Sequence, residues 1–115
     1  MNELRLASDV VRKRKKALKN IEKYLSLIKK RVKRTLGNDA SVYVFGSFLN
    51  KRKFKPFLSD IDVLITSNKI RKSIRERAKI RAKIERGLPE IFELHLADKE
   101  MFKIYRKFVR KMRKV

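Results

Sequence analysis

The first third of the chain has apolar residues at every third or fourth position, with lysine and arginine filling the positions between them. This spacing is typical of an amphipathic helix that buries one stripe of side chains. Ser8 or Asp9 can cap its start, and Gly37–Asn38 ends it near Leu36. We therefore predict one long N-terminal helix, whose buried stripe consists of Leu18, Ile21, Leu25, Ile28 and Val32.

Three later segments have the composition of strands. Residues 41–45 are Ser-Val-Tyr-Val-Phe and stop at Gly46, and residues 60–66 place two aspartates in an apolar run. Residues 91–96 alternate, with apolar Phe92, Leu94 and Leu96 on one face and polar Glu93 and His95 on the other. We predict a strand over each segment.

The connections complete the predicted order. Residues 48–58 are basic, lack glycine and show no period, so we predict a loop that opens with a helical turn at Ser47. A helix over 69–86 has cap candidates in Thr66, Ser67 and Asn68. Asp98 caps a last helix whose apolar stripe is Met101, Tyr105, Phe108 and Met112. The order α-β-loop-β-α-β-α predicts one α+β domain over residues 1–115, a small mixed sheet with helices on one face.

Charge changes this picture. The 115 residues hold 34 Lys and Arg against 12 Asp and Glu, a net charge of +22, which attracts nucleic acid or nucleotide phosphates. Basic runs along both terminal helices are either solvated faces or a nucleic-acid patch. No Cys is present, and no apolar run is long enough to span a membrane, so we expect a cytoplasmic protein; the composition is compatible with a thermophile.

The scarce acids gather in one place. Asp60 and Asp62 are two residues apart on a predicted strand, so they point to the same face, and Glu93 and His95 share that face if the helices cover the other. Like charges side by side repel unless a cation lies between them, and three carboxylates can hold Mg²⁺ while leaving positions for triphosphate oxygens. The alternatives are a solvated sheet face for the aspartates and a plain surface acid for Glu93. His95, the sole histidine, is either structural, with a hydrogen bond to Glu93, or a phosphate contact.

A phosphate site is predicted beside these acids. Gly46 allows close backbone approach, and the Ser47 hydroxyl and neighbouring N–H groups can bind phosphate. The basic loop residues that could neutralise the remaining phosphate charge are Lys51, Arg52 and Lys53.

Phe45-Gly46-Ser47 followed by Ser59-Asp60-Ile61-Asp62-Val63-Leu64-Ile65 resembles the signature of the nucleotidyltransferase superfamily that includes polymerase beta. More narrowly, residues from about Ile21 onward resemble the minimal nucleotidyltransferases of archaea and bacteria. The resemblance implies that Gly46 and Ser47 bind nucleotide phosphates, and that Asp60, Asp62 and Glu93 bind two Mg²⁺ ions, for which Mn²⁺ can substitute. The basic, glycine-free loop 48–58 departs from the small glycine-containing turn of the family.

These features predict an enzyme that moves a nucleoside monophosphate from an NTP, ATP above all, to a hydroxyl of a protein or RNA. The resemblance implies a partner of the HEPN type, a helical protein, in a toxin–antitoxin pair. The sequence is also compatible with a homo-oligomer. The alternatives are a basic RNA-binding protein that kept the fold with little catalysis, and a purely structural basic protein.

Overall fold

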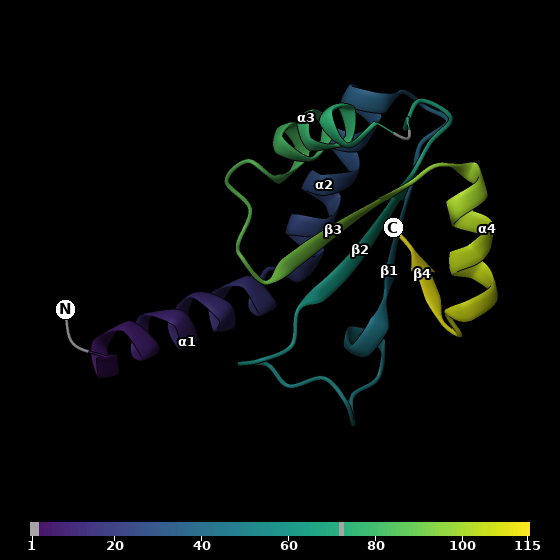
Figure 1. The fold of residues 1–115 in the computed structure, drawn as a ribbon. Helices are drawn as coiled ribbons and strands as arrows, with labels where there is room; N and C mark the ends of the chain where they lie inside the picture. Colours follow the sequence, from purple (N-terminus) through teal and green to yellow (C-terminus); the bar gives the residue numbers. More distant parts are fainter. Residues whose placement is uncertain (1–2, 72) are drawn as a thin grey trace.

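A four-stranded mixed sheet and four α-helices make up the computed structural model, which describes residues 3–71 and 73–115 (Figure 1). In chain order the elements are α1 (Glu3–Lys19), α2 (Ile21–Leu36), β1 (Ser41–Phe45), the 3₁₀ turn η1 (Gly46–Leu49), β2 (Ile61–Thr66), α3 (Ile74–Glu85), β3 (Phe92–Ala97), α4 (Lys99–Phe108) and β4 (Met112–Lys114). The strand order is β3-β2-β1-β4, with β1 antiparallel to both its neighbours and β2 parallel to β3. The predicted α+β class, the three strands and the helical turn after β1 are confirmed.

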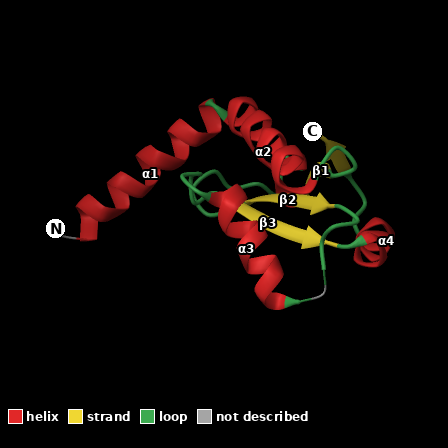
Figure 2. Ribbon diagram, turned by 90° about the horizontal axis from the view of Figure 1, so that it is seen from above, coloured by secondary structure: helices red, strands yellow, loops and turns green. Residues whose placement is uncertain are grey.

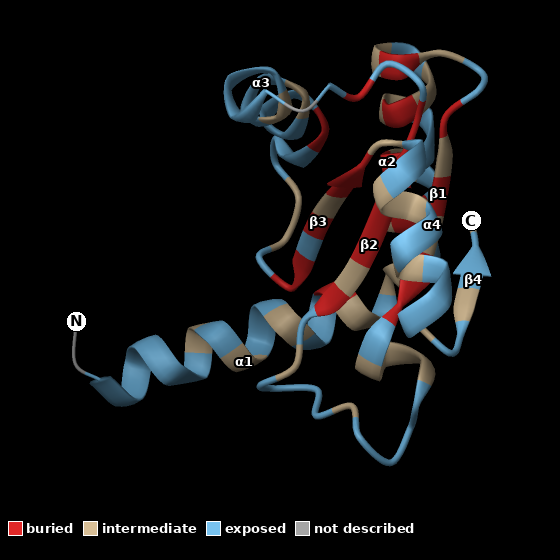
Figure 3. Cartoon of the chain, turned by 45° about the vertical axis from the view of Figure 1, so that its right-hand side comes forward, coloured by how far each residue is buried: buried red, intermediate tan, exposed pale blue. Residues whose placement is uncertain are grey.

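Helices α2 and α3 cover one face of the sheet (Figure 2). Alternation in the three long strands sends Val42 and Val44, Ile61, Val63 and Ile65, and Phe92, Leu94 and Leu96 into this core. The stripe of α2 meets them with Leu25, Ile28, Val32 and Leu36, all at most 2% exposed. In Figure 3 the buried positions accordingly concentrate in β2 and on the inner side of α2.

Helix α4 lies on the other face, which differs from the prediction that all helices share one side. Phe45, Leu64 and Ala97 form a second small core there, against which Met101, Phe102 and Tyr105 of α4 pack. The reason is that the outward positions of the strands are not all polar, so their apolar part also needs cover. The same face carries Asp62, Glu93 and His95, and α4 leaves this polar end uncovered.

The predicted single N-terminal helix is wrong, because the chain breaks at Asn20. The Asn20 side chain donates a hydrogen bond to the Lys16 carbonyl at 2.9 Å, and its backbone N–H bonds to the Ala17 carbonyl. Asparagine competes with the backbone for such bonds and so favours a helix end over a helix interior. Before the break, α1 projects from the body of the molecule (Figure 1). The whole molecule, α1 included, measures 45 Å in its longest dimension.

The predicted start of the third helix is also wrong. Helix α3 begins at Ile74, capped by the Ser73 hydroxyl, which accepts from the Glu76 N–H. The residues predicted to cap it are held elsewhere: Asp39 accepts hydrogen bonds from the Asn68 N–H at 3.1 Å and the Ser67 hydroxyl at 3.2 Å. The Asn68 N–H, with help from Ser67 and Lys69, lowers the pKa of the Asp39 carboxyl.

The last predicted helix ends earlier than its apolar stripe suggested. Helix α4 stops at Phe108, whose side chain is 81% exposed, and Met112 belongs to β4 instead. The backbone turns extended at Val109, and β4 then pairs with β1 from Tyr43 to Phe45. Three residues without strand composition form this strand because an unpaired edge of β1 is available to them.

Within the described residues, each helix is too short or too polar to cross a lipid bilayer.

Candidate active site

Gly46 stands directly against Asp62. Antiparallel pairing places Phe45 opposite Asp62, and the chain then turns at Gly46 with a φ of +81°. A Cβ at this position would collide with Asp62 Oδ2, so a residue with any side chain would displace the carboxylate. Glycine is therefore required here for two reasons: it adopts the left-handed backbone conformation without strain, and it leaves space for the Asp62 carboxylate.

Asp62, Glu93 and His95 form one cluster at the uncovered end of the sheet. Parallel pairing sets Asp62 opposite Glu93, and His95 follows on the same face two residues later. His95 Nε2 lies 3.0 Å from Asp62 Oδ1 and 4.0 Å from Glu93 Oε1. Ligand atoms of the three residues all lie within 4.8 Å of one another. Two carboxylates and an imidazole at this spacing fit a divalent cation, so the donor set suits a metal centre.

Aromatic side chains hold the His95 ring in place. Its ring lies edge-on to Phe45, with centroids 5.2 Å apart, and to Tyr105 of α4 at 6.4 Å. The side chain of His95 is 25% exposed and that of Asp62 is 24% exposed, whereas Glu93 is 55% exposed. Asp62 and His95 are thus fixed by packing, and Glu93 stands at the solvent side.

Asp60 is not part of this cluster. It precedes β2, and its Oδ1 lies 3.7 Å from the guanidinium of Arg14 on α1. The Arg14 side chain is only 13% exposed, and it also donates hydrogen bonds to the carbonyls of Pro56, at 2.9 Å, and Ser59. One arginine therefore joins α1 to the loop that leads into the site.

Arg14 was not predicted as a site residue because it belongs to a run of five basic residues. One signal could have found it. Arg14 lies three and four residues before Ala17 and Leu18, at a position that the apolar stripe would otherwise fill. A charge in an apolar stripe indicates a buried partner, which here is loop 50–60.

The predicted phosphate residues have two different settings. Ser47 lies in η1 and directly follows Gly46, the residue that stands against Asp62. Lys51, Arg52 and Lys53 are exposed on the following loop, and none of them pairs with an acid in the part of the chain that the structure describes. Phe54 anchors this loop by packing edge-on against Phe48.

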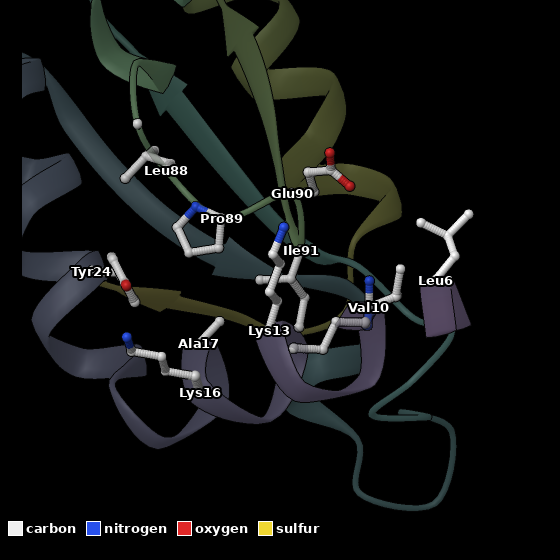
Figure 4. Close-up of a pocket in the computed structure, with 12 residues that line it drawn as sticks. Leu6, Val10, Lys13, Lys16, Ala17, Tyr24, Leu88, Pro89, Glu90 and Ile91 are labelled. Atoms are coloured by element: carbon white, nitrogen blue, oxygen red, sulfur yellow. The ribbon is translucent and has the colours of Figure 1, made fainter. Parts of the chain in front are cut away.

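A groove of about 520 Å³ lies between α1 and residues 87–91 (Figure 4). Its lining is mixed: Leu6 and Val10 on α1 and Ile91 before β3 are apolar, and Lys13 and Lys16 are basic. None of the cluster residues lines it. Arg14 is shared between this groove and Asp60.

Comparison with known proteins shows the family of the chain. A family model described as a nucleotidyltransferase domain matches residues 21–115, that is, everything from α2 onward. The chain belongs to this nucleotidyltransferase family. Helix α1, which supplies Arg14, lies outside the matched segment.

Two solved structures share the fold. The first, a crystal structure assigned as a nucleotidyltransferase, is 30% identical over 79% of this chain and 96% of its own, with a TM-score of 0.61. The second, from Sulfolobus solfataricus and assigned in the same way, covers 91% of this chain and 84% of its own at 20% identity and a TM-score of 0.57, so its likeness concerns the fold alone. No curated protein matches the chain.

Proposed function

We propose that this nucleotidyltransferase moves AMP from ATP to a hydroxyl group of a macromolecular acceptor. The observation that carries the proposal is the contact of Gly46 with the Asp62 carboxylate, which itself lies opposite Glu93. A glycine–serine turn against an acid pair places groups for phosphate and for a cation side by side. The acceptor hydroxyl would attack the α-phosphorus, and the bond to the β-phosphate would break with release of pyrophosphate.

The proposed metal ligands are Asp60, Asp62 and Glu93, with Mg²⁺ as the ion and Mn²⁺ as its substitute. Two bound ions would activate the acceptor hydroxyl and neutralise the leaving pyrophosphate. Asp62 and Glu93 already face each other across β2 and β3. Asp60 would join them only by leaving Arg14, because its carboxylate is directed toward that guanidinium.

The phosphate contacts would come from Gly46, which stands against Asp62, and from Ser47, which follows it in η1. Lys51, Arg52 and Lys53 would supply positive charge to the β- and γ-phosphates when loop 50–60 lies over the nucleotide. All three are exposed, which leaves them available for this. The two anchors of the loop, Phe54 and Arg14, limit how far it can move.

For the acceptor we propose a helical protein of the HEPN type, in a cytoplasmic toxin–antitoxin pair in which the transferase adenylylates its partner. The support is the resemblance of the site motif, together with the small surface that the chain offers for choosing an acceptor by itself. We also propose that residues 1–115 act as one domain, because Arg14 ties α1 to the loop beside the site.

A second candidate is binding of RNA without catalysis. Helix α1 projects from the body and is coloured as exposed over most of its length (Figure 3). Its exposed residues include Lys13, Lys15, Lys16 and Lys19. Such a charged arm attracts any polyanion.

The dependence of ATP affinity on metal separates the two candidates. We expect ATP to bind at least about tenfold more tightly with Mn²⁺ than with EDTA, and this gain to vanish in Asp62→Asn. Glu90→Gln, which removes an exposed acid outside the cluster, is the matched control. ATP affinity that is equal with and without metal, and that falls only with added salt, would support the RNA-binding candidate instead.

A further inference from the structure

We propose that His95 is itself a metal ligand, and that the nucleotide-free site, in which Asp60 pairs with Arg14, therefore prefers divalent ions that accept imidazole, such as Zn²⁺ and Co²⁺, over Mg²⁺. This inference rests on the proposed function in that it concerns the same site, but it assigns a ligand and a class of metal that the resemblance does not imply. The ion would be held by one oxygen from Asp62, one from Glu93, and Nε2 of His95.

The distances support a shared ion. His95 Nε2 lies 3.0 Å from Asp62 Oδ1 and 4.0 Å from Glu93 Oε1. Neighbouring ligands around an ion at about 2.1 Å from each are about 3 Å apart in octahedral and about 3.4 Å apart in tetrahedral coordination. His95 and Asp62, 3.0 Å apart, are already close to this range, and only the exposed Glu93 side chain would need to approach.

The orientation of the ring supports the same conclusion. Phe45 and Tyr105 pack edge-on against the imidazole and direct Nε2 toward the two carboxylates. The absent side chain of Gly46 leaves space for the Asp62 carboxylate, which already lies 3.0 Å from Nε2 before any ion is bound.

While Asp60 pairs with Arg14, the acid pair of Asp62 and Glu93 has no third carboxylate beside it among the described residues. Asp60 would be the third carboxylate by resemblance, yet it pairs with Arg14 at 3.7 Å. His95 supplies the missing donor atom. Nitrogen in place of oxygen shifts preference toward metals that bind imidazole well, whereas Mg²⁺ favours oxygen.

The chain offers an unambiguous probe, because His95 is its only histidine. We would label histidine with ¹⁵N and titrate the full chain with Zn²⁺ alone, without nucleotide, following both ring nitrogens by NMR. We expect the Nε2 resonance to shift strongly at one equivalent of Zn²⁺, with a smaller change at Nδ1. An unmoved Nε2 resonance in the presence of saturating Zn²⁺ would overturn the proposal.

Variants give a second readout. His95→Gln should lower Zn²⁺ affinity by about tenfold or more while changing Mg²⁺ affinity by less than about threefold. Glu90→Gln, the matched control outside the cluster, should bind Zn²⁺ as the unaltered chain does. Equal Zn²⁺ affinity in His95→Gln would contradict the proposal. If that variant does not fold, the titration of the unaltered chain decides alone.

The outcome does not depend on catalysis. A shifted Nε2 resonance in a protein that transfers no nucleotide would support the assignment of His95 as a ligand and contradict the proposed function. Nucleotide transfer with an unmoved Nε2 resonance would support the proposed function and contradict the assignment of His95 as a ligand.

Discussion

At the scale of single residues, the site depends most on Gly46. Its φ of +81° costs a residue with a side chain about 1–2 kcal/mol, and its Cβ would strike the Asp62 carboxylate. We predict that Gly46→Ala abolishes Mn²⁺-dependent ATP binding, measured by calorimetry, because Asp62 is pushed out of the cluster.

Gly87→Ala provides the control for Gly46→Ala. Gly87 also has a positive φ, +72°, but nothing lies within 4 Å of the position its Cβ would take. It should therefore lose stability through backbone strain alone and bind ATP normally. Normal binding by Gly46→Ala as well would show that the contact with Asp62 is irrelevant to the site.

A second residue-scale prediction concerns Asp39, far from the cluster. The Asn68 N–H hydrogen bond, aided by Ser67 and Lys69, lowers the pKa of this carboxyl in the folded chain. The unfolded chain, with an ordinary pKa of about 3.9, therefore takes up a proton first as the pH falls. The stabilisation is present at neutral pH and is lost as the pH falls through the folded-state pKa.

Asp39→Asn tests this assignment. The variant should melt at a lower temperature than the unaltered chain at pH 7, and the gap should close in acid, when Asp39 itself is neutral. Thermal melts followed by circular dichroism across this range give the comparison. A gap that stays constant with pH would mean that the charge of Asp39 contributes nothing.

At the scale of elements, the strands were predictable because each carries its own signal. Alternation in residues 91–96 and the apolar run after Asp60 depend only on which side chains face the core. The break of the N-terminal helix depends on local hydrogen bonds of Asn20, but the other misjudged elements depend on partners distant in sequence. Asp39 holds Ser67 and Asn68 away from helix capping, and the edge of β1 recruits Met112 into β4.

The candidate site was likewise predictable where it depends on strand alternation, and not where it depends on a distant partner. The register of two parallel strands brings Asp62, Glu93 and His95 to one face, as alternation predicted. Asp60 lies one residue before β2, so the two-residue repeat of a strand does not fix its side chain. Its pairing with Arg14, 46 residues away, depends on the angle at which α1 leaves Asn20, which no local pattern encodes.

Helix α1 is the element whose role can be tested most simply. Arg14 donates to two carbonyls of loop 50–60, and hydrogen bonds from charged groups contribute about 1.5–3 kcal/mol. We predict that Arg14→Gln lowers the free energy of unfolding by about this amount and speeds amide exchange in residues 50–60. Lys13→Gln, at the exposed neighbouring position, is the control. Unchanged exchange in Arg14→Gln would show that α1 does not anchor the loop.

At the scale of the whole molecule, the charge imbalance shapes how the chain is held together. With 34 basic residues and 12 acids, many cations cannot pair with a carboxylate. Arg31 instead donates to the Ile84 carbonyl at the end of α3, and Arg77, which also pairs with Asp98 at 3.7 Å, donates to the Leu96 carbonyl at the end of β3. Basic side chains thus satisfy carbonyl groups at helix and strand ends.

The remaining positive charge predicts salt-dependent RNA binding by α1. Replacing Lys13, Lys16 and Lys19 with Gln should reduce the slope of log affinity against log salt by about 0.7 for each phosphate of single-stranded RNA that α1 no longer neutralises. Replacing Lys79, Arg81 and Lys83, which are exposed on α3, removes the same charge from another surface. This variant should reduce the slope less than the α1 variant does. Equal slopes in both variants would show that RNA binds by net charge and not at α1.

The central claim is that the chain transfers a nucleotide from ATP through Asp62 and Glu93, and position-specific labelling tests it most directly. The chain is incubated with Mn²⁺, candidate RNA and protein acceptors, and ATP labelled on either the α- or the γ-phosphorus. We predict that only the α-label enters an acceptor, with pyrophosphate released, and that Asp62→Asn and Glu93→Gln abolish labelling while Glu90→Gln does not. Transfer of the γ-label, or α-labelling that survives in Asp62→Asn, would contradict the claim.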